Sequence, residues 1–121
     1  MHPSLTVVVP AFDEEERLGS CLERLSTQTH PIDEIIVVDN CSTDDTVRIA
    51  QSHQRLNPAI RILAESTVGV NAARTRGFDA ATSALIAKID ADTGVPANWS
   101  DSVCGFFEAD THADVAAITG P

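Results

Sequence analysis

Residues 5–28 read LTVVVPAFDEEERLGSCLERLSTQ and set a pattern that the rest of the chain repeats. The β-branched run Leu5–Val9 is closed by Pro10, which predicts a short buried strand. Apolar side chains then recur at the spacing of one helix face, at Leu18, Cys21, Leu22 and Leu25. That spacing predicts a helix over Asp13–Gln28, whose first-turn acids would complement the positive end of the helix dipole.

The same alternation of short apolar runs and helical segments continues along the chain. Further strands are predicted at Ile35–Val38, Ile60–Leu63, Ala84–Ile89 and Val115–Thr119. Helices are predicted from Ser42, close to a capping-box pattern, to Asn57-Pro58, then over Asn71–Ser83 and Pro96–Glu108. The helix predicted over Asn71–Ser83 has a face of small residues suited to close packing on a sheet: Ala73, Gly77, Ala80 and Ala81. The order βαβαβαβαβ predicts an α/β fold, a three-layer sandwich whose mainly parallel sheet is covered on both faces.

The composition favours one domain over residues 1–121 and argues against several partners. The 121 residues are 43% apolar, and none of their apolar runs approaches the roughly 20 residues that cross a bilayer. With 18 acidic and 8 basic residues, the formal net charge of −10 argues against nucleic acid or anionic lipid as a partner. The 3 cysteines are widely separated without a C-x-x-C spacing, so we expect reduced thiols. Residues 1–4 lead into a short strand-like run without the basic start and long apolar stretch of a secretion signal, so we expect a cytoplasmic location.

Ligands of parallel α/β sheets bind at the carboxyl ends of the strands, so the segments that follow the predicted strands are the candidate site. These segments are Pro10–Glu14, Asp39–Asp44, Glu65–Asn71 and Asp90–Thr93. The first of them has no Gly-rich phosphate-binding turn, and its acids would repel a phosphate. A nucleoside diphosphate bound here would therefore need its charge neutralised by something else.

The triplet Asp90-Ala91-Asp92 offers a way to neutralise that charge. Two carboxylates one residue apart at the end of a buried strand can aim at one hard divalent cation, and that cation can bridge two phosphates. The alternative is an ordinary acidic turn, because turn chemistry often produces such triplets. Placement directly after a predicted strand favours the cation.

Each of the other polar residues near the strand ends has two possible interpretations. Asp39 either accepts a hydrogen bond from a ribose hydroxyl or base N–H, or forms a turn with Asn40. Arg74 and Arg76 lie early in a predicted helix and face either a phosphate or solvent. Lys88 lies in a predicted buried strand, where pairing with an acid and a functional role are equally consistent with its position.

Four ordered blocks of sequence resemble the family 2 glycosyltransferases with the GT-A fold. The blocks are VVVPAFDEE (Val7–Glu15), IIVVDNCSTDDT (Ile35–Thr46), GVNAARTRG (Gly69–Gly77) and AKIDADT (Ala87–Thr93). The resemblance covers essentially the whole chain and implies the half of that fold that binds a nucleotide sugar. It also implies that the first four strands lie in the order 3-2-1-4.

The resemblance further implies roles for individual residues. Asp39 would bind the base, and Arg74 would lie near the base or the phosphates. Asp90 and Asp92 would hold Mn or Mg against the diphosphate, with Asp92 favoured as the direct ligand. The full set of implied donor-binding residues is Pro10, Ala11, Phe12, Glu14, Asp39, Arg74 and Asp90.

This sequence departs from the family pattern in three places. Asp13 stands where Asn is commoner, and Asn40-Cys41 replaces a more usual Asp-Gly or Asn-Gly turn. The acid that would deprotonate the acceptor hydroxyl is expected beyond Pro121, so no catalytic base is nominated and the acceptor half is taken to be absent. The sequence thus predicts the donor-binding part of an inverting, metal-dependent glycosyltransferase that transfers a sugar from a nucleotide-diphosphate sugar to an unidentified hydroxyl.

Two alternatives come from other functional classes. One is a catalytically silent nucleotide-binding or assembly module that pairs as a homodimer through a bare sheet edge. The other is a metal-dependent nucleotidyltransferase, which the acids after the first strand disfavour because that class more often has a Gly-rich basic loop there. A position at the cytoplasmic face of a membrane, reached through a missing region or a partner, is compatible with each of these functions.

Overall fold

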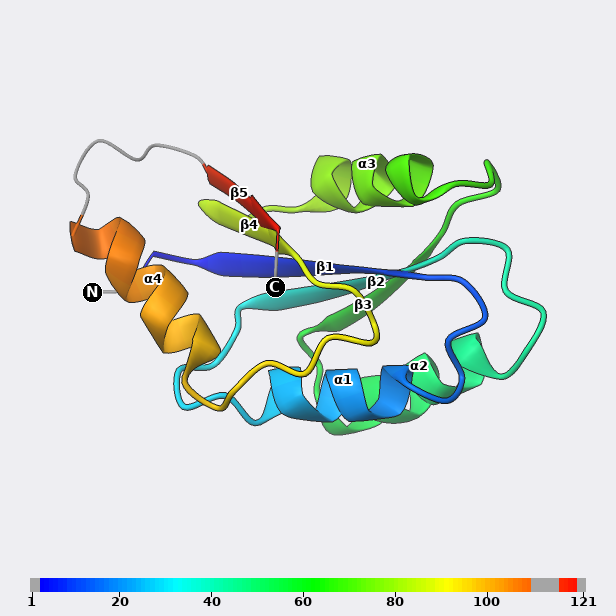
Figure 1. Cartoon of the computed structure of the whole chain (residues 1–121), viewed down its shortest axis with the longest axis horizontal. Helices are drawn as coiled ribbons and strands as arrows, with labels where there is room; N and C mark the ends of the chain where they lie inside the picture. Colours follow the sequence, from blue (N-terminus) through cyan, green and yellow to red (C-terminus); the bar gives the residue numbers. More distant parts are fainter. Residues whose placement is uncertain (1–2, 110–115, 120–121) are drawn as a thin grey trace.

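Helices cover both faces of a parallel sheet in the computed structural model, which describes residues 3–109 and 116–119 (Figure 1). The sheet has five strands in the order β3-β2-β1-β4-β5, and each neighbouring pair is parallel. The strands are β1 (Leu5–Ala11), β2 (Glu34–Asp39), β3 (Ile60–Ala64), β4 (Leu85–Lys88) and β5 (Ala116–Thr119). The helices are α1 (Leu18–Ser26), α2 (Thr46–Leu56), α3 (Val70–Ala80) and α4 (Trp99–Ala109). The α/β class and the expected order of the first four strands are confirmed.

Both faces of the central strand β1 are buried, which explains its unbroken apolar sequence. Leu5, Val7 and Val9 belong to a cluster that includes buried side chains of α1 and α2, whereas Val8 packs with Ala73 of α3. Figure 1 shows the same division, with α1 and α2 on one side of the sheet and α3 on the other. Alternate residues of one strand therefore serve two separate cores, as in other parallel sheets covered on both faces.

The register of the sheet brings the ends of its strands together. Ala11 at the end of β1 is level with Asp39 of β2, and Asp39 is level with Ala64 of β3. Pro10 was expected to close the first strand, but it lies within β1, beyond the residues that pair with β4. Proline has no amide N–H, and this is tolerated at Pro10 because β1 pairs there with β2 but no longer with β4. The segments that follow β1, β2 and β3 thus leave the sheet side by side.

Close packing of α3 on the sheet depends on Gly77. A Cβ atom on Gly77 would lie 2.3 Å from Cγ1 of Val8 and 3.2 Å from Cγ2 of Val38. Ala73, one helical turn earlier, is also fully buried. The face of small residues is therefore what allows this helix to contact β1 and β2.

The predicted start of α1 is wrong, because the helix begins at Leu18 rather than at Asp13. Asp13 has a φ of 50°, outside the right-handed helical region. The N–H groups of Asp13 and Glu14 donate to Ser42 Oγ at 3.0 Å and Thr46 Oγ1 at 2.9 Å, which ties them to the loop before α2 and to the first residue of that helix. The acids that resemble a first helical turn therefore form a separate turn held by residues about thirty positions away.

The predicted capping box of α2 is also wrong, because this helix begins at Thr46 rather than near Ser42. The Ser42 hydroxyl accepts the N–H of Asp13, while Asp44 Oδ1 accepts the N–H of Thr46 at 2.9 Å. The other elements differ from their predicted bounds by at most three residues at either end. Within the described ranges, no helix combines the length and apolar content needed to cross a membrane.

Glu34, at the start of β2, is a partly buried carboxylate held by three other segments. It accepts hydrogen bonds from Arg61 Nη1 at 2.7 Å, Thr6 Oγ1 at 2.9 Å and the Thr82 amide at 3.3 Å. Burial by itself would raise the pKa of Glu34, but the donated hydrogen bonds outweigh burial and hold this pKa below its usual value. The ionised form of Glu34 therefore stabilises the fold.

We expect Glu34→Gln to lower the free energy of unfolding at neutral pH by about 1 kcal/mol, because charge-assisted hydrogen bonds become neutral ones. The folded-state pKa of Glu34 is depressed, so its contribution is present above the unfolded pKa and is lost as pH falls through the folded pKa. Urea titrations from neutral pH to about pH 3 should show the variant and the parent converging. Glu23→Gln, an exposed change on α1, is the control, and a pH-independent gap for Glu34→Gln would contradict the prediction.

Candidate functional site

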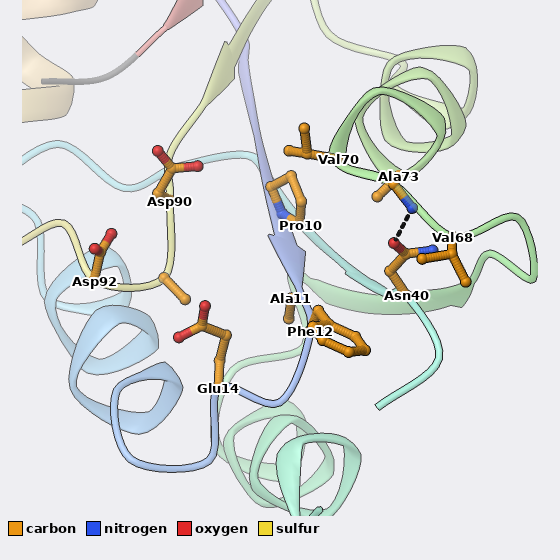
Figure 2. Close-up of a pocket in the computed structure, with 12 residues that line it drawn as sticks. Pro10, Ala11, Phe12, Glu14, Asn40, Val68, Val70, Ala73, Asp90 and Asp92 are labelled. Atoms are coloured by element: carbon orange, nitrogen blue, oxygen red, sulfur yellow. Dashed lines mark hydrogen bonds between the residues drawn. The ribbon is translucent and has the colours of Figure 1, made fainter. Parts of the chain in front are cut away.

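A cavity of about 410 Å³ lies at the carboxyl ends of the strands, where the sequence predicts the site (Figure 2). Segments far apart in the sequence form its walls. They are the end of β1 and the turn after it (Pro10, Ala11, Phe12, Glu14), Asn40 after β2, the start of α3 with the loop before it (Val68, Gly69, Val70, Ala73), and the residues after β4 (Asp90, Ala91, Asp92).

The two sides of this cavity differ in chemistry. Phe12 and Val68 lie on one side, and their apolar side chains are 53% and 74% exposed. The carboxylates of Glu14, Asp90 and Asp92 lie on the other side (Figure 2). Large apolar side chains left open beside a cavity suit a flat ring, whereas carboxylates suit a cation. The arrangement is therefore suited to a ligand with a ring at one end and a cation-bound group at the other.

The two acids after β4 have basic partners of different strength. Lys88 Nζ lies 2.9 Å from Asp90 Oδ1, and the Lys88 side chain is only 13% exposed. Arg17 Nη1 lies 3.6 Å from Asp92 Oδ2, and both of these side chains are more than half exposed. An exposed pair at that distance contributes little, so Asp92 is the easier of the two carboxylates for a new ligand to engage. The sequence leaves open whether Lys88 pairs with an acid or has a functional role, and in the structure it pairs with Asp90.

Negative charge is concentrated on the acidic side of the cavity. Burial raises the pKa of Glu14, and so do the nearby charges of Asp92, Asp44 and Asp90, while Arg17 acts in the opposite direction. Burial, with Asp92, Asp90 and Glu14 adding to it, also raises the pKa of the Cys21 thiol to about 12. Burial is the larger cause of both shifts, and the part that comes from the neighbouring carboxylates reflects a negative potential that a bound cation would relieve.

The donor set fits a cation that is shared with a ligand. Among the residues that the structure describes, no three or more His, Cys, Asp or Glu side chains group so as to hold a metal ion by themselves. Asp90 and Asp92 supply carboxylate oxygens, and Mg²⁺ in nucleotide sites is commonly held by one or two carboxylates together with substrate phosphates and water. The residues present therefore fit a divalent cation that arrives with a diphosphate.

The structure brings most of the predicted donor-binding residues into this cavity. Pro10, Ala11, Phe12, Glu14 and Asp90 line it, together with the predicted metal ligand Asp92.

Asp39 and Arg74 lie outside the cavity as lined by the described residues. Asp39 Oδ1 accepts the N–H of Ser42 at 3.2 Å, which is the turn-forming alternative. Arg74 Nη2 donates to Asn71 Oδ1 at 3.2 Å on the surface of α3.

Three lining residues, Asn40, Val68 and Val70, lie in strand-end segments that the sequence predicts as the candidate site, but the sequence assigns them no binding role. Arg17, which contacts Asp92, lies outside those segments. For Asn40 the sequence indicates a turn with Asp39 and a departure from the family pattern. Val68 and Val70 flank Gly69, whose φ of 136° puts a sharp bend in the backbone before α3. Two valines that flank a glycine in a strand-end segment are the sequence signal that could identify this apolar wall of the cavity. Arg17 is hidden in the acidic run, because its contact with Asp92 depends on where α1 begins.

Comparison with solved structures places this chain in the GT-A fold class. It matches the crystal structure of residues 1–349 of Staphylococcus aureus TarS with a TM-score of 0.81 at 23% identity, over 88% of this chain and 32% of that one. The chain belongs to glycosyl transferase family 2, whose sequence profile matches residues 6–120.

Individual relatives agree with that assignment. The chain is 36% identical over 91 residues to the uncharacterized glycosyltransferase YibD of Escherichia coli, covering 75% of this chain and 26% of YibD. It is 33% identical over 100 residues to the glycosyltransferase AglE of Haloferax volcanii, covering 80% of this chain and 33% of AglE. A mannosyltransferase from Pyrobaculum calidifontis, solved with GDP-Man and Mn²⁺, matches with a TM-score of 0.77 at 28% identity, over 86% of this chain and 31% of that one. The chain thus spans about a quarter to a third of the length of these proteins.

Proposed function

We propose that this chain is the donor-binding part of an inverting glycosyltransferase that transfers a sugar from a nucleotide-diphosphate sugar to an acceptor hydroxyl. The observation that carries the proposal is the cavity at the strand ends, with apolar side chains on one side and carboxylates on the other. Membership of glycosyl transferase family 2, and the GDP-Man and Mn²⁺ of the Pyrobaculum calidifontis mannosyltransferase, support it.

The base of the nucleotide would lie on the apolar side of the cavity. Phe12 supplies an exposed aromatic face, and Val68 and Val70 supply further aliphatic surface of the same cavity. Burying a ring between such side chains removes apolar area from water without requiring charge. Asp39 would accept a base N–H once the ligand reaches the end of β2, and Arg74 would approach the base or the phosphates from α3.

The diphosphate would lie on the acidic side, next to Asp90 and Asp92. These carboxylates repel a diphosphate unless a cation lies between them, so Mn²⁺ or Mg²⁺ would bind together with the donor. When bound, the cation would act as a Lewis acid that stabilises the departing diphosphate. Asp92, with its exposed and distant partner Arg17, would be the direct ligand, and Asp90 would be held in place by the partly buried Lys88.

Titration of the protein with UDP and with GDP, each with and without Mn²⁺, tests the proposal. We expect isothermal titration calorimetry to detect binding of at least one nucleotide when Mn²⁺ is present and much weaker binding when EDTA removes it. Binding of neither nucleotide in Mn²⁺ would contradict the proposed function. Equal affinity with Mn²⁺ and with EDTA would contradict the role of the cation.

A further inference from the structure

Asn40 joins three walls of the cavity through hydrogen bonds. It is 4% exposed, and its backbone N–H donates to the carbonyl oxygen of Ala11 at 2.8 Å. Its side-chain Nδ2 donates to the carbonyl oxygens of Glu65 at 3.0 Å and Thr67 at 2.8 Å, and its Oδ1 accepts the N–H of Gly69 at 2.9 Å. Both amide N–H groups and the amide oxygen are therefore used in one direction, toward residues 65–69.

The segment that Asn40 holds has little apolar anchoring of its own. Val68 and Val70 are 74% and 56% exposed, and a Cβ on Gly69 would meet no described atom within 4 Å. Backbone segments that bury few apolar groups depend on their hydrogen bonds for a fixed position. The N–H of Glu65 bonds to the carbonyl of Asp39, and the side chain of Asn40 adds three further bonds to the segment. The Cys41 thiol makes longer contacts of 3.5 Å with the carbonyl oxygens of Glu65 and Ser66.

We propose that Asn40 is a positioning residue for the nucleoside, because its amide holds the Val68–Val70 wall at a fixed separation from Phe12. The inference rests on the proposed function, since it needs a base between those two walls. It also explains why an amide suits this position. An aspartate here would put a buried carboxylate oxygen against the carbonyl oxygens of Glu65 and Thr67, with repulsion in place of two hydrogen bonds.

The test compares the parent with Asn40→Asp and Asn40→Ala in two measurements. Calorimetry with UDP or GDP in Mn²⁺ should give a dissociation constant about tenfold higher for each variant. Amide hydrogen exchange should become faster at residues 65–70 of the variants and remain unchanged in α1, which separates loss of the wall from general loosening of the fold. In the parent, the nucleotide should slow exchange at the same amides.

Asn57→Asp is the matched control. Asn57 follows α2, at the opposite end of the strands, and its side chain also bonds in two directions, to Ser26 Oγ at 3.0 Å and from the Ala59 N–H at 3.0 Å. This variant should bind nucleotide as the parent does.

Three outcomes decide between the proposals. A parent that binds neither nucleotide overturns the proposed function, and the inference about Asn40 with it. A parent that binds nucleotide, with both Asn40 variants within about twofold of its affinity, overturns the inference alone. Unchanged exchange at residues 65–70 on nucleotide binding to the parent also overturns the inference alone, whether or not the variants fold.

Discussion

Asp92→Ala should raise the dissociation constant for UDP or GDP in Mn²⁺ about 100-fold, a loss of close to 3 kcal/mol of binding free energy. The substitution removes the carboxylate that we propose as direct ligand, and with it the means to hold the cation against the diphosphate. Asp92 is more than half exposed and its partner Arg17 lies 3.6 Å away, so the fold should tolerate the change. Calorimetric titration, with an unfolding curve of the same preparation, checks the prediction.

Asp79→Ala is a suitable control for Asp92→Ala, because it removes the same charge from an exposed position near the far end of α3. Its affinity for the nucleotide should match that of the parent. If Asp92→Ala binds as tightly as the parent in Mn²⁺, the assignment of the cation to this carboxylate is wrong.

Gly77→Ala should lower the free energy of unfolding by about 1–3 kcal/mol, although alanine is the better helix former. The added methyl would lie 2.3 Å from Cγ1 of Val8, a fully buried side chain on the central strand, so the Val8 side chain, α3 or β1 must shift. Urea unfolding of the variant and the parent, followed by circular dichroism, measures the difference. A variant as stable as the parent would show that α3 has room to move away from the sheet.

Gly105→Ala offers the matched control. It makes the same change inside α4, where no described atom lies within 4 Å of the new Cβ. Here the helix propensity of alanine should dominate, and stability should be unchanged or higher by up to about 1 kcal/mol. If the free energy of unfolding falls for Gly77→Ala and rises for Gly105→Ala, the effect of packing is separated from that of helix propensity.

The strands and the contact face of α3 could be predicted because local patterns determine them. Each apolar run that the sequence analysis assigned to a strand is a strand, and the small residues Ala73 and Gly77 do face the sheet. The bounds of α1 and α2 could not be predicted in this way. Asp13 and Ser42 look like helix-start residues locally, yet their hydrogen bonds join each other's loops across 29 positions. Whether such a residue caps its own helix or bonds to a distant loop is decided by tertiary contacts, which a local sequence pattern does not contain.

The residues of the candidate site also fall into those that the sequence predicts and those that it does not. The residues that follow β1 and β4 were found because strand ends are predictable, and the resemblance to a family gave them roles. For Asn40 the sequence indicates only a turn with Asp39 and a departure from the family pattern, because its three side-chain bonds reach backbone atoms of residues 65–69 and leave no mark in the sequence. Arg17 was missed because its contact with Asp92 requires α1 to begin at Leu18.

The mutual hydrogen bonds of the strand-end loops have a consequence for the thermodynamics of binding. Ordering a flexible loop costs about 1–2 kcal/mol of conformational entropy per residue. The turn at Asp13–Glu14 and the segment 65–69 are already fixed by bonds to Ser42, Thr46 and Asn40, so that entropy is lost when the chain folds. A ligand that enters the cavity then meets backbone walls with little disorder left to remove, and more of its contact energy remains as affinity.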